Sequence, residues 1–138
     1  MTHKVTTIWK GGMAFEADLG GHKIPMDAAG DDGGKDSGAR PKPLLLAALA
    51  GCSGMDVVSI LEKMREPCTW FEMRTEAETA EEHPKRYVGY KMIYRFKKSD
   101  GLDGEKVHKA VELSQNKYCG VSASLKPGAP VEWEIEYV

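Results

Sequence analysis

One stretch of the chain, residues 40–65 (RPKPLLLAALAGCSGMDVVSILEKMR), constrains the fold more than any other. It is apolar on nearly all sides at helical spacing, and small residues surround a cysteine, Cys52, in its middle. A helix that is apolar all round is typical of a buried position. The stretch therefore predicts a central buried helix, and its small residues allow another backbone to approach closely beside Cys52.

The chain has 138 residues, which is the size of one domain. A domain of this size has too little other structure to enclose a helix that is apolar all round, because a sheet covers only one side of it. We therefore expect a single domain over residues 1–138. A second copy of the chain is the natural source of the missing cover.

Charge and composition exclude several classes of function. The chain has 19 Lys and Arg against 21 Asp and Glu, with the signs interspersed, so we expect no nucleic-acid surface. The apolar run inside the central stretch is about 12 residues, short of the roughly 20 that a membrane span needs. No charged start followed by an apolar run precedes residue 44, so we expect a cytoplasmic protein without a membrane partner.

Alternating polar and apolar residues predict strands on both sides of the central helix. Three short alternating segments over residues 5–26, joined by glycine turns, predict an antiparallel meander. A Gly- and Asp-rich loop over residues 28–39 then leads into the helix. Residues 70–79 and 88–97 predict a hairpin whose outer faces carry opposite charges and pair across the strands.

A second amphipathic helix is expected to end near Asn116, and VEWEIEYV, residues 131–138, predicts the last strand. The order is therefore βββ-α-ββ-α-β, an α+β fold without an internal repeat. Such an order places one helix between two sets of strands.

Three cysteines, Cys52, Cys68 and Cys119, are an odd number without a CxxC pair, which in a reducing compartment indicates free or catalytic thiols. A cysteine on an apolar helix is more often inert than reactive, and a reactive Cys52 needs a nearby cation. Arg40, where the loop meets the helix, is the nearest candidate in the sequence. About twelve residues of helix span roughly 18 Å, so contact requires the loop to fold back or a second subunit's loop to cross over.

Cys119 lies just beyond the second helix, in KYCGVSASLKPG, where it has more freedom than in a core. Two thiols that meet in a cytoplasmic protein support redox turnover, in which a thiolate attacks an oxidant, becomes a sulfenic acid and condenses with the second thiol to a disulfide. Composition alone does not say whether Cys52 and Cys119 meet. Cys68, beside Pro67, is assigned to packing at the start of a strand.

Metal and nucleotide sites are not predicted. The four histidines show neither HxxxH nor HExxH spacing, and the glycine-rich loop lacks the pattern of a phosphate-binding loop, so we expect no cofactor. Asp56 lies one turn beyond Cys52 on the same side of the helix. It is a contact in a dimer seam, a base or a satisfied structural carboxylate, and we favour the last.

The segment LLLAALAGCSGMDVVSILEKM, the later KYCGVSASL and the order of the elements together resemble the OsmC/Ohr family of thiol-dependent peroxidases, most of all its YhfA-like branch. The resemblance implies antiparallel sheets that wrap around the crossing central helices of an intertwined homodimer. It also implies that Cys52 is the peroxidatic cysteine, which attacks the O–O bond of an organic hydroperoxide, and that Cys119 is the resolving cysteine. A small dithiol or a lipoyl-bearing protein would be the reductant.

Two positions depart from the family pattern. Family members carry a glutamate nine residues before the first cysteine, where this chain has Pro43. That glutamate orients an arginine of the preceding loop against the thiolate, and Arg40 replaces this arginine only by proximity. The departures imply slow turnover.

The leading hypothesis is an enzyme, a cytoplasmic homodimeric peroxidase that reduces organic hydroperoxides. The alternative is a catalytically weak redox sensor or small-molecule-binding dimer. A third interpretation treats both thiols as packing residues.

Overall fold

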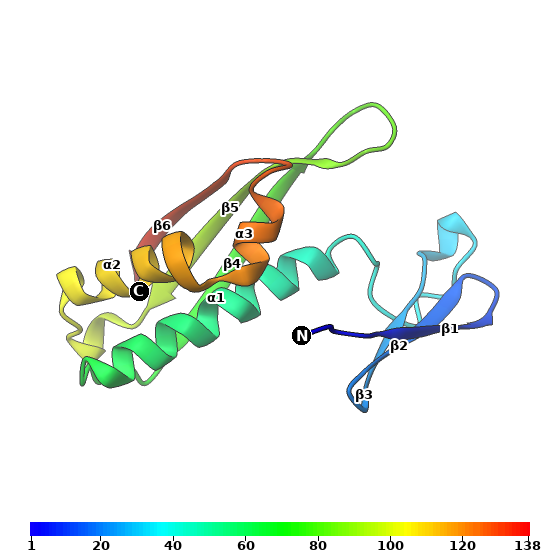
Figure 1. Ribbon diagram of the computed structural model, residues 1–138. Helices are drawn as coiled ribbons and strands as arrows, with labels where there is room; N and C mark the ends of the chain where they lie inside the picture. The colour runs from blue at the N-terminus through cyan, green and yellow to red at the C-terminus, as the bar shows by residue number, and fades with distance from the viewer. The chain divides into compact units, whose positions relative to one another are not determined.

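The computed structural model describes all residues, 1–138, and the chain divides into two compact units, Met1–Leu45 and Leu46–Val138. The elements follow one another in the expected order of strands and helices, with a few short helical turns added (Figure 1). The α+β class is therefore confirmed. A single domain over residues 1–138 stays a prediction.

The first unit contains an antiparallel sheet in the order β1-β2-β3, with β1 Thr6–Gly11, β2 Ala14–Leu19 and β3 His22–Met26. Both of its turns are made by glycine pairs with positive φ, a backbone conformation that L side chains rarely adopt. The strand β3 lies at the edge of the sheet, with only an isolated bridge from Met26 to Ala39 on its other side, so the proline within it removes no hydrogen bond from a central ladder. The predicted meander is confirmed.

The loop expected before the central helix is present, and it is organised around one buried carboxylate. Asp27 accepts hydrogen bonds from the backbone N–H groups of Ala28, Lys35 and Ser37 at 2.8, 3.0 and 3.1 Å. The Ser37 hydroxyl donates a fourth at 2.6 Å. A short turn, η1 (Gly30–Asp32), lies within the loop. Asp27 thus binds backbone N–H groups on both sides of η1.

The acid stability of the chain is expected to depend on Asp27. Hydrogen bonds from the Ser37 side chain and backbone, then from other backbone N–H groups, hold the pKa of Asp27 well below its ordinary 3.8. The stability that this lowered pKa contributes is complete above the ordinary value and is lost as the pH falls toward the folded value. In urea titrations, the stability difference between wild type and Asp27→Asn should narrow from about pH 5 to about pH 2. A difference that does not change with pH would contradict this expectation.

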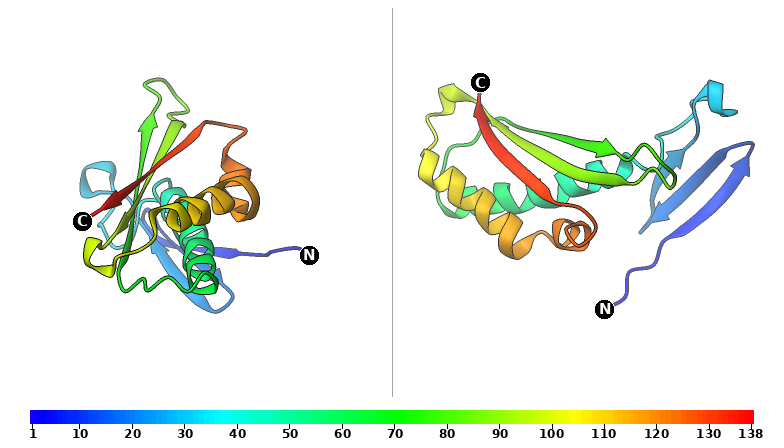
Figure 2. Two further views of the ribbon diagram at one scale, coloured as in Figure 1. Left: turned by 90° about the vertical axis from the view of Figure 1, so that its left-hand side faces the viewer. Right: turned by 90° about the horizontal axis from the view of Figure 1, so that it is seen from above.

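The second unit contains most of the central helix and a three-stranded sheet. The elements are α1 (Leu44–Lys63), β4 (Phe71–Thr79), β5 (Tyr87–Phe96), η2 (Lys98–Asp100), α2 (Gly104–Leu113), one turn of π-helix named η3 (Ser114–Tyr118), α3 (Gly120–Leu125) and β6 (Val131–Tyr137). The two helices α1 and α2 lie against the same face of the sheet (Figure 2). Their inward side chains and those of β5 form the hydrophobic core.

The sheet has the order β4-β5-β6, and β6 runs parallel to β5. The expectation that both sheets are antiparallel is therefore wrong for this pair. Between β5 and β6 the chain crosses over through α2 and α3, and a connection of this length returns the chain in the same direction. The predicted hairpin of β4 and β5 is antiparallel.

Charged side chains pair across the outer face of this sheet, as predicted. Arg95 on β5 contacts Glu72 on β4 at 2.6 Å and Glu136 on β6 at 3.2 Å. Lys91 contacts Glu134 at 3.4 Å. The basic strand thus lies between two acidic ones.

Val88 does not point into the core as the alternation predicted. A β-bulge shifts the register near the end of the hairpin, so that Thr79 pairs with Tyr87 while Glu78 pairs with Gly89. Val88 is the extra residue and is 36% exposed, whereas Tyr87 is buried. Such a bulge adds one residue to one strand, which reverses the alternation from that point on.

The rest of the second unit does not enclose the helix α1. Only one stripe of it, Leu49, Ser53, Val57 and Leu61, is buried. Met55 is 76% exposed and Val58 50%. By length and composition, the helix is also long and apolar enough to cross a membrane, since it extends beyond the apolar run of the sequence. The core helix of a soluble protein passes the same test.

Candidate thiol site

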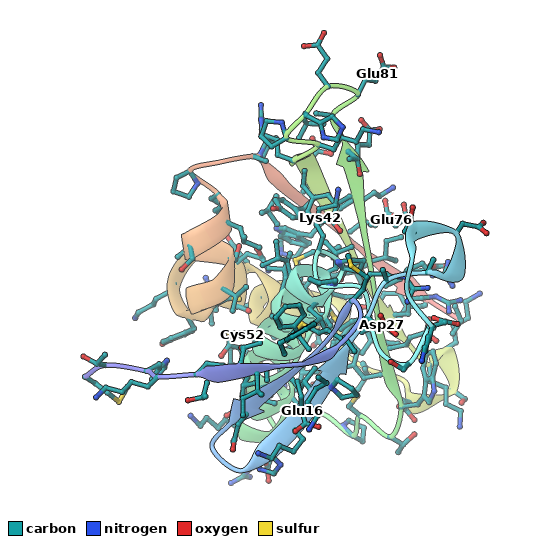
Figure 3. All side chains as sticks on the ribbon, turned by 90° about the vertical axis from the view of Figure 1, so that its right-hand side faces the viewer. Glu16, Asp27, Lys42, Cys52, Glu76 and Glu81 are labelled. Atoms are coloured by element: carbon teal, nitrogen blue, oxygen red, sulfur yellow. The ribbon has the colours of Figure 1, made fainter.

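The two candidate thiols lie on different elements of the second unit. Cys52, labelled in Figure 3, is in the middle of α1. It is half-buried. Cys119 is the N-cap residue of α3 and is 3% exposed. Both are free thiols. The site therefore has one half-buried and one buried cysteine.

The structure brings these two thiols together, although they are far apart in the sequence. Burial raises the pKa of Cys119 from its ordinary 9.0 to about 11, which the Ser122 N–H, 3.4 Å from Sγ, partly offsets. A hydrogen bond with the Cys52 side chain, and the charges of Cys52 and Asp56, raise it further. Cys119 is therefore a thiol at neutral pH, and Cys52 packs against the core cluster to which Cys119 belongs.

The turn of π-helix η3 sets the position of Cys119. The expected second helix ends as α2 at Leu113, and the chain continues as η3 to Tyr118. The Cys119 N–H donates to the Ser114 carbonyl at 2.8 Å, five residues back. Such turns are rare and are often found at functional sites.

A hydrogen-bonded group of five side chains lies beside the thiols, and we call it the polar cluster. Its members are Ser53, Tyr94, Ser114, Gln115 and Ser122. The Ser53 hydroxyl is 2.6 Å from the Tyr94 hydroxyl and 2.7 Å from that of Ser114. The Gln115 amide nitrogen donates to Tyr94 at 2.8 Å, and its oxygen accepts from the Ser122 hydroxyl at 2.8 Å. The polar cluster joins α1, β5, η3 and α3.

Asp56 lies at one end of the polar cluster. Its carboxylate accepts a hydrogen bond of 2.9 Å from the Ser114 hydroxyl. It is thus a satisfied carboxylate, the interpretation that we favoured. Tyr94 stays neutral because burial, against hydrogen bonds from Ser53 and Gln115, raises its pKa to about 12.

Sequence reasoning missed the polar cluster because its members come from four elements without any spacing between them. One signal was available. Ser53 lies four residues from both Leu49 and Val57, so it interrupts the buried stripe of α1 with a hydroxyl. A polar residue in such a stripe indicates a buried hydrogen-bond partner.

Arg40 belongs to the other unit, Met1–Leu45. Its guanidinium contacts the Asp36 carboxylate at 2.8 Å and donates to the Gly38 carbonyl at 3.1 Å. Its expected role toward Cys52 stays a prediction. Pro43 lies in the turn that precedes α1.

Cys68 does not join the thiol pair. It precedes β4, and its thiol donates a long hydrogen bond of 3.6 Å to the Trp70 carbonyl. Burial raises its pKa. No group of three or more His, Cys, Asp or Glu side chains is placed to hold a metal ion.

Alkaline pH is expected to destabilise the protein through Cys119. Because its pKa is raised in the folded state, its contribution to stability is complete below the ordinary 9.0 and is lost as the pH rises to about 11. Two pKa units correspond to on the order of 3 kcal/mol. In denaturant titrations between these two pH values, the free energy of unfolding should fall less with rising pH for Cys119→Ser than for wild type. Equal losses for both proteins would contradict the assignment.

Comparison with known proteins identifies the family. Residues 34–134 match the family model described as OsmC-like protein. Protein YhfA from Escherichia coli is 34% identical over 131 residues, which are 94% of each chain. A hypothetical protein from Aquifex aeolicus has a TM-score of 0.84 at 27% identity, covering 100% of this chain and 98% of that one. The organic hydroperoxide resistance protein OhrB of Bacillus subtilis has a TM-score of 0.68 at 20% identity, covering 99% and 98%.

The similarity to OhrB is a similarity of fold alone, because the identity is low. The family model and YhfA, by contrast, match the sequence on both sides of the division between the two units. The chain therefore belongs to the OsmC-like family.

Proposed function

We propose that the protein is a thiol peroxidase that reduces organic hydroperoxides through Cys52 and Cys119. The observation that carries the proposal is that a half-buried thiol on α1 packs against the core cluster that holds a buried thiol at the start of α3, whose pKa it influences. The names of fold neighbours such as OhrB add support. Cys52 is the sulfur that a hydroperoxide can reach.

The reaction consists of two steps. The Cys52 thiolate attacks one peroxide oxygen, the O–O bond breaks, and the products are a sulfenic acid on Cys52 and an alkoxide that takes a proton to become the alcohol. The Cys119 thiol then attacks the sulfenic sulfur. A disulfide forms and hydroxide leaves with the Cys119 proton as water. Since Cys119 is buried and protonated, it does not compete for the peroxide.

The difference in burial also favours a dithiol, such as a small dithiol or a lipoyl-bearing protein, as reductant. An incoming thiolate reaches Cys52, so the mixed disulfide forms there and Cys119 is released beside it. With a monothiol, Cys119 can attack the mixed disulfide and re-form the original bond. The second thiol of a dithiol competes with this reverse reaction, because its attack on the mixed disulfide is intramolecular as well, whereas a monothiol requires a second molecule.

We further propose that the protein is a homodimer. The exposed side of α1 and the neighbouring strand β4 form an apolar hollow of about 620 Å³, lined among others by Met55, Val58, Phe71 and Met73. Exposed apolar surface of this kind marks an interaction site. A second copy of α1 provides apolar cover of the matching kind, as the sequence predicted.

Two expectations complete the proposal. Arg40 is the cation proposed to stabilise the Cys52 thiolate, since a guanidinium lowers the energy of a neighbouring thiolate. The protein is proposed to act in the cytoplasm, where its three thiols stay reduced.

The test is consumption of hydroperoxide by the purified protein with dithiothreitol. Cumene hydroperoxide and two alkyl hydroperoxides are supplied, and residual peroxide is measured by oxidation of ferrous ion. Wild type should turn over faster than Cys52→Ser with at least one of them. Equal rates with all three would overturn the proposed enzyme.

Pro43, in place of a family glutamate, favours a second candidate, a redox sensor or small-molecule-binding dimer with little turnover. For the sensor, mass spectrometry after peroxide exposure would show a reversible disulfide between Cys52 and Cys119 without consumption beyond one equivalent. If both thiols only pack, native alkylation modifies neither of them.

A further inference from the structure

The two proposed reaction steps do not use the polar cluster, although it lies beside both thiols. Burying polar side chains costs free energy, and apolar residues of the same shape are often equally stable in their place. All five members are buried, and Gln115 is only 4% exposed. Stability alone therefore does not explain why these five positions carry polar side chains.

Gln115 connects the surroundings of the two thiols. Its amide nitrogen donates to the Ser53 hydroxyl at 3.2 Å, and Ser53 follows Cys52 on α1. Its amide oxygen accepts from the Ser122 hydroxyl at 2.8 Å, while the Ser122 backbone N–H donates to the sulfur of Cys119. Gln115 therefore binds the residue that follows Cys52, and it also binds the residue whose backbone N–H contacts the sulfur of Cys119.

The turn that carries Cys119 is attached to α1 at a second point. The carbonyl of Ser114 accepts the Cys119 N–H at 2.8 Å. The hydroxyl of the same residue is bound to Ser53 at 2.7 Å and to Asp56 at 2.9 Å, both on α1. A turn of π-helix is not a stable unit by itself, so these contacts determine where it lies.

We propose that Gln115 is the positioning residue of the thiol pair, and that through the polar cluster it fixes the turn that carries Cys119 against the helix that carries Cys52. The inference rests on the proposed use of this pair as a redox couple. A disulfide requires a Cβ to Cβ distance of roughly 3.5–4.5 Å and a dihedral angle near 90°. Apolar packing alone tolerates a displacement of the Cys119 turn by about 1 Å, which is enough to leave this distance range. Directional hydrogen bonds do not tolerate it.

The experiment measures the effective concentration of one thiol toward the other. The full chain, with Cys68→Ser so that only the pair reacts, is equilibrated with reduced and oxidised dithiothreitol, and the disulfide fraction is read by mass spectrometry. Gln115→Leu is compared with Leu61→Ala, which removes buried apolar volume from α1, the helix that carries Cys52, but no hydrogen bond of the polar cluster. We expect Gln115→Leu to lower the effective concentration roughly 100-fold.

Leu61→Ala should lower stability while leaving the effective concentration near that of wild type. An unchanged value for Gln115→Leu, or an equal loss for Leu61→Ala, would overturn the proposal. If Gln115→Leu does not fold, Ser122→Ala decides, because it removes only the hydroxyl bound to Gln115: a lower effective concentration supports positioning and an unchanged one refutes it. The equilibrium contains no hydroperoxide, so its failure is distinct from failure of peroxide turnover.

Discussion

Replacing Cys119 by serine is expected to leave the first reaction with hydroperoxide intact and to slow all later turnovers strongly. Cys52 keeps its place on α1 in this variant, so one equivalent of hydroperoxide is consumed per chain. The resulting sulfenic acid then lacks the thiol that condenses with it. Steady-state turnover with a dithiol should fall by on the order of 1,000-fold. A rapid-mixing assay separates the first equivalent from the later ones.

Trapping identifies the species that accumulates. Dimedone added after the hydroperoxide should label Cys52 in Cys119→Ser and give little label in wild type, where the disulfide forms first. Cys68→Ser serves as the matched control, since Cys68 lies before β4 and outside the thiol pair, and it should behave as wild type. Full turnover by Cys119→Ser would mean that Cys119 is not the resolving cysteine.

Replacing Met55 by glutamate is expected to dissociate and destabilise the proposed dimer. Met55 is 76% exposed in the single chain, so the substitution should change the stability of an isolated chain by no more than about 0.5 kcal/mol. In a dimer that covers this side of α1, the same carboxylate is buried without a partner. Each such charge costs on the order of 4 kcal/mol.

Sedimentation equilibrium and thermal unfolding together distinguish an isolated chain from a dimer that covers Met55. Wild type should sediment as a dimer, and Met55→Glu should sediment as a monomer with a lower midpoint of unfolding. Val138→Glu places the same side chain at an exposed apolar residue at the chain end, where it should leave both quantities unchanged. A monomeric wild type, or a dimeric Met55→Glu of normal stability, would contradict the predicted interface.

Most of the fold could be predicted from the sequence because its signals are local. The alternation in residues 88–97 gave β5 apart from Val88, where a bulge reversed the pattern. Glycine pairs gave the turns of the first sheet, since only glycine readily adopts their backbone conformation. The parallel pairing of β6 had no such signal, because strand direction depends on how the crossover packs.

The candidate site could be predicted only as separate residues. Cys52 and Cys119 were evident from their elements and from the family resemblance, but the place where their side chains meet depends on the rotation of α1 and on the π-helical turn η3. Gln115 gave no signal, since its four hydrogen bonds run to β5, α1 and α3. Sequence distance does not reveal such partners.

The sequence by itself therefore determined the order of the elements, their buried faces and the existence of a helix too apolar for one chain to cover. The tertiary structure alone decided which side of that helix the chain covers, and that Cys52 lies on the side that meets Cys119. The physical reason is that periodicity is set by neighbours along the chain, whereas contact between distant thiols is set by the packing of the whole core. The same packing buried Ser53 with its partners and left Met55 exposed.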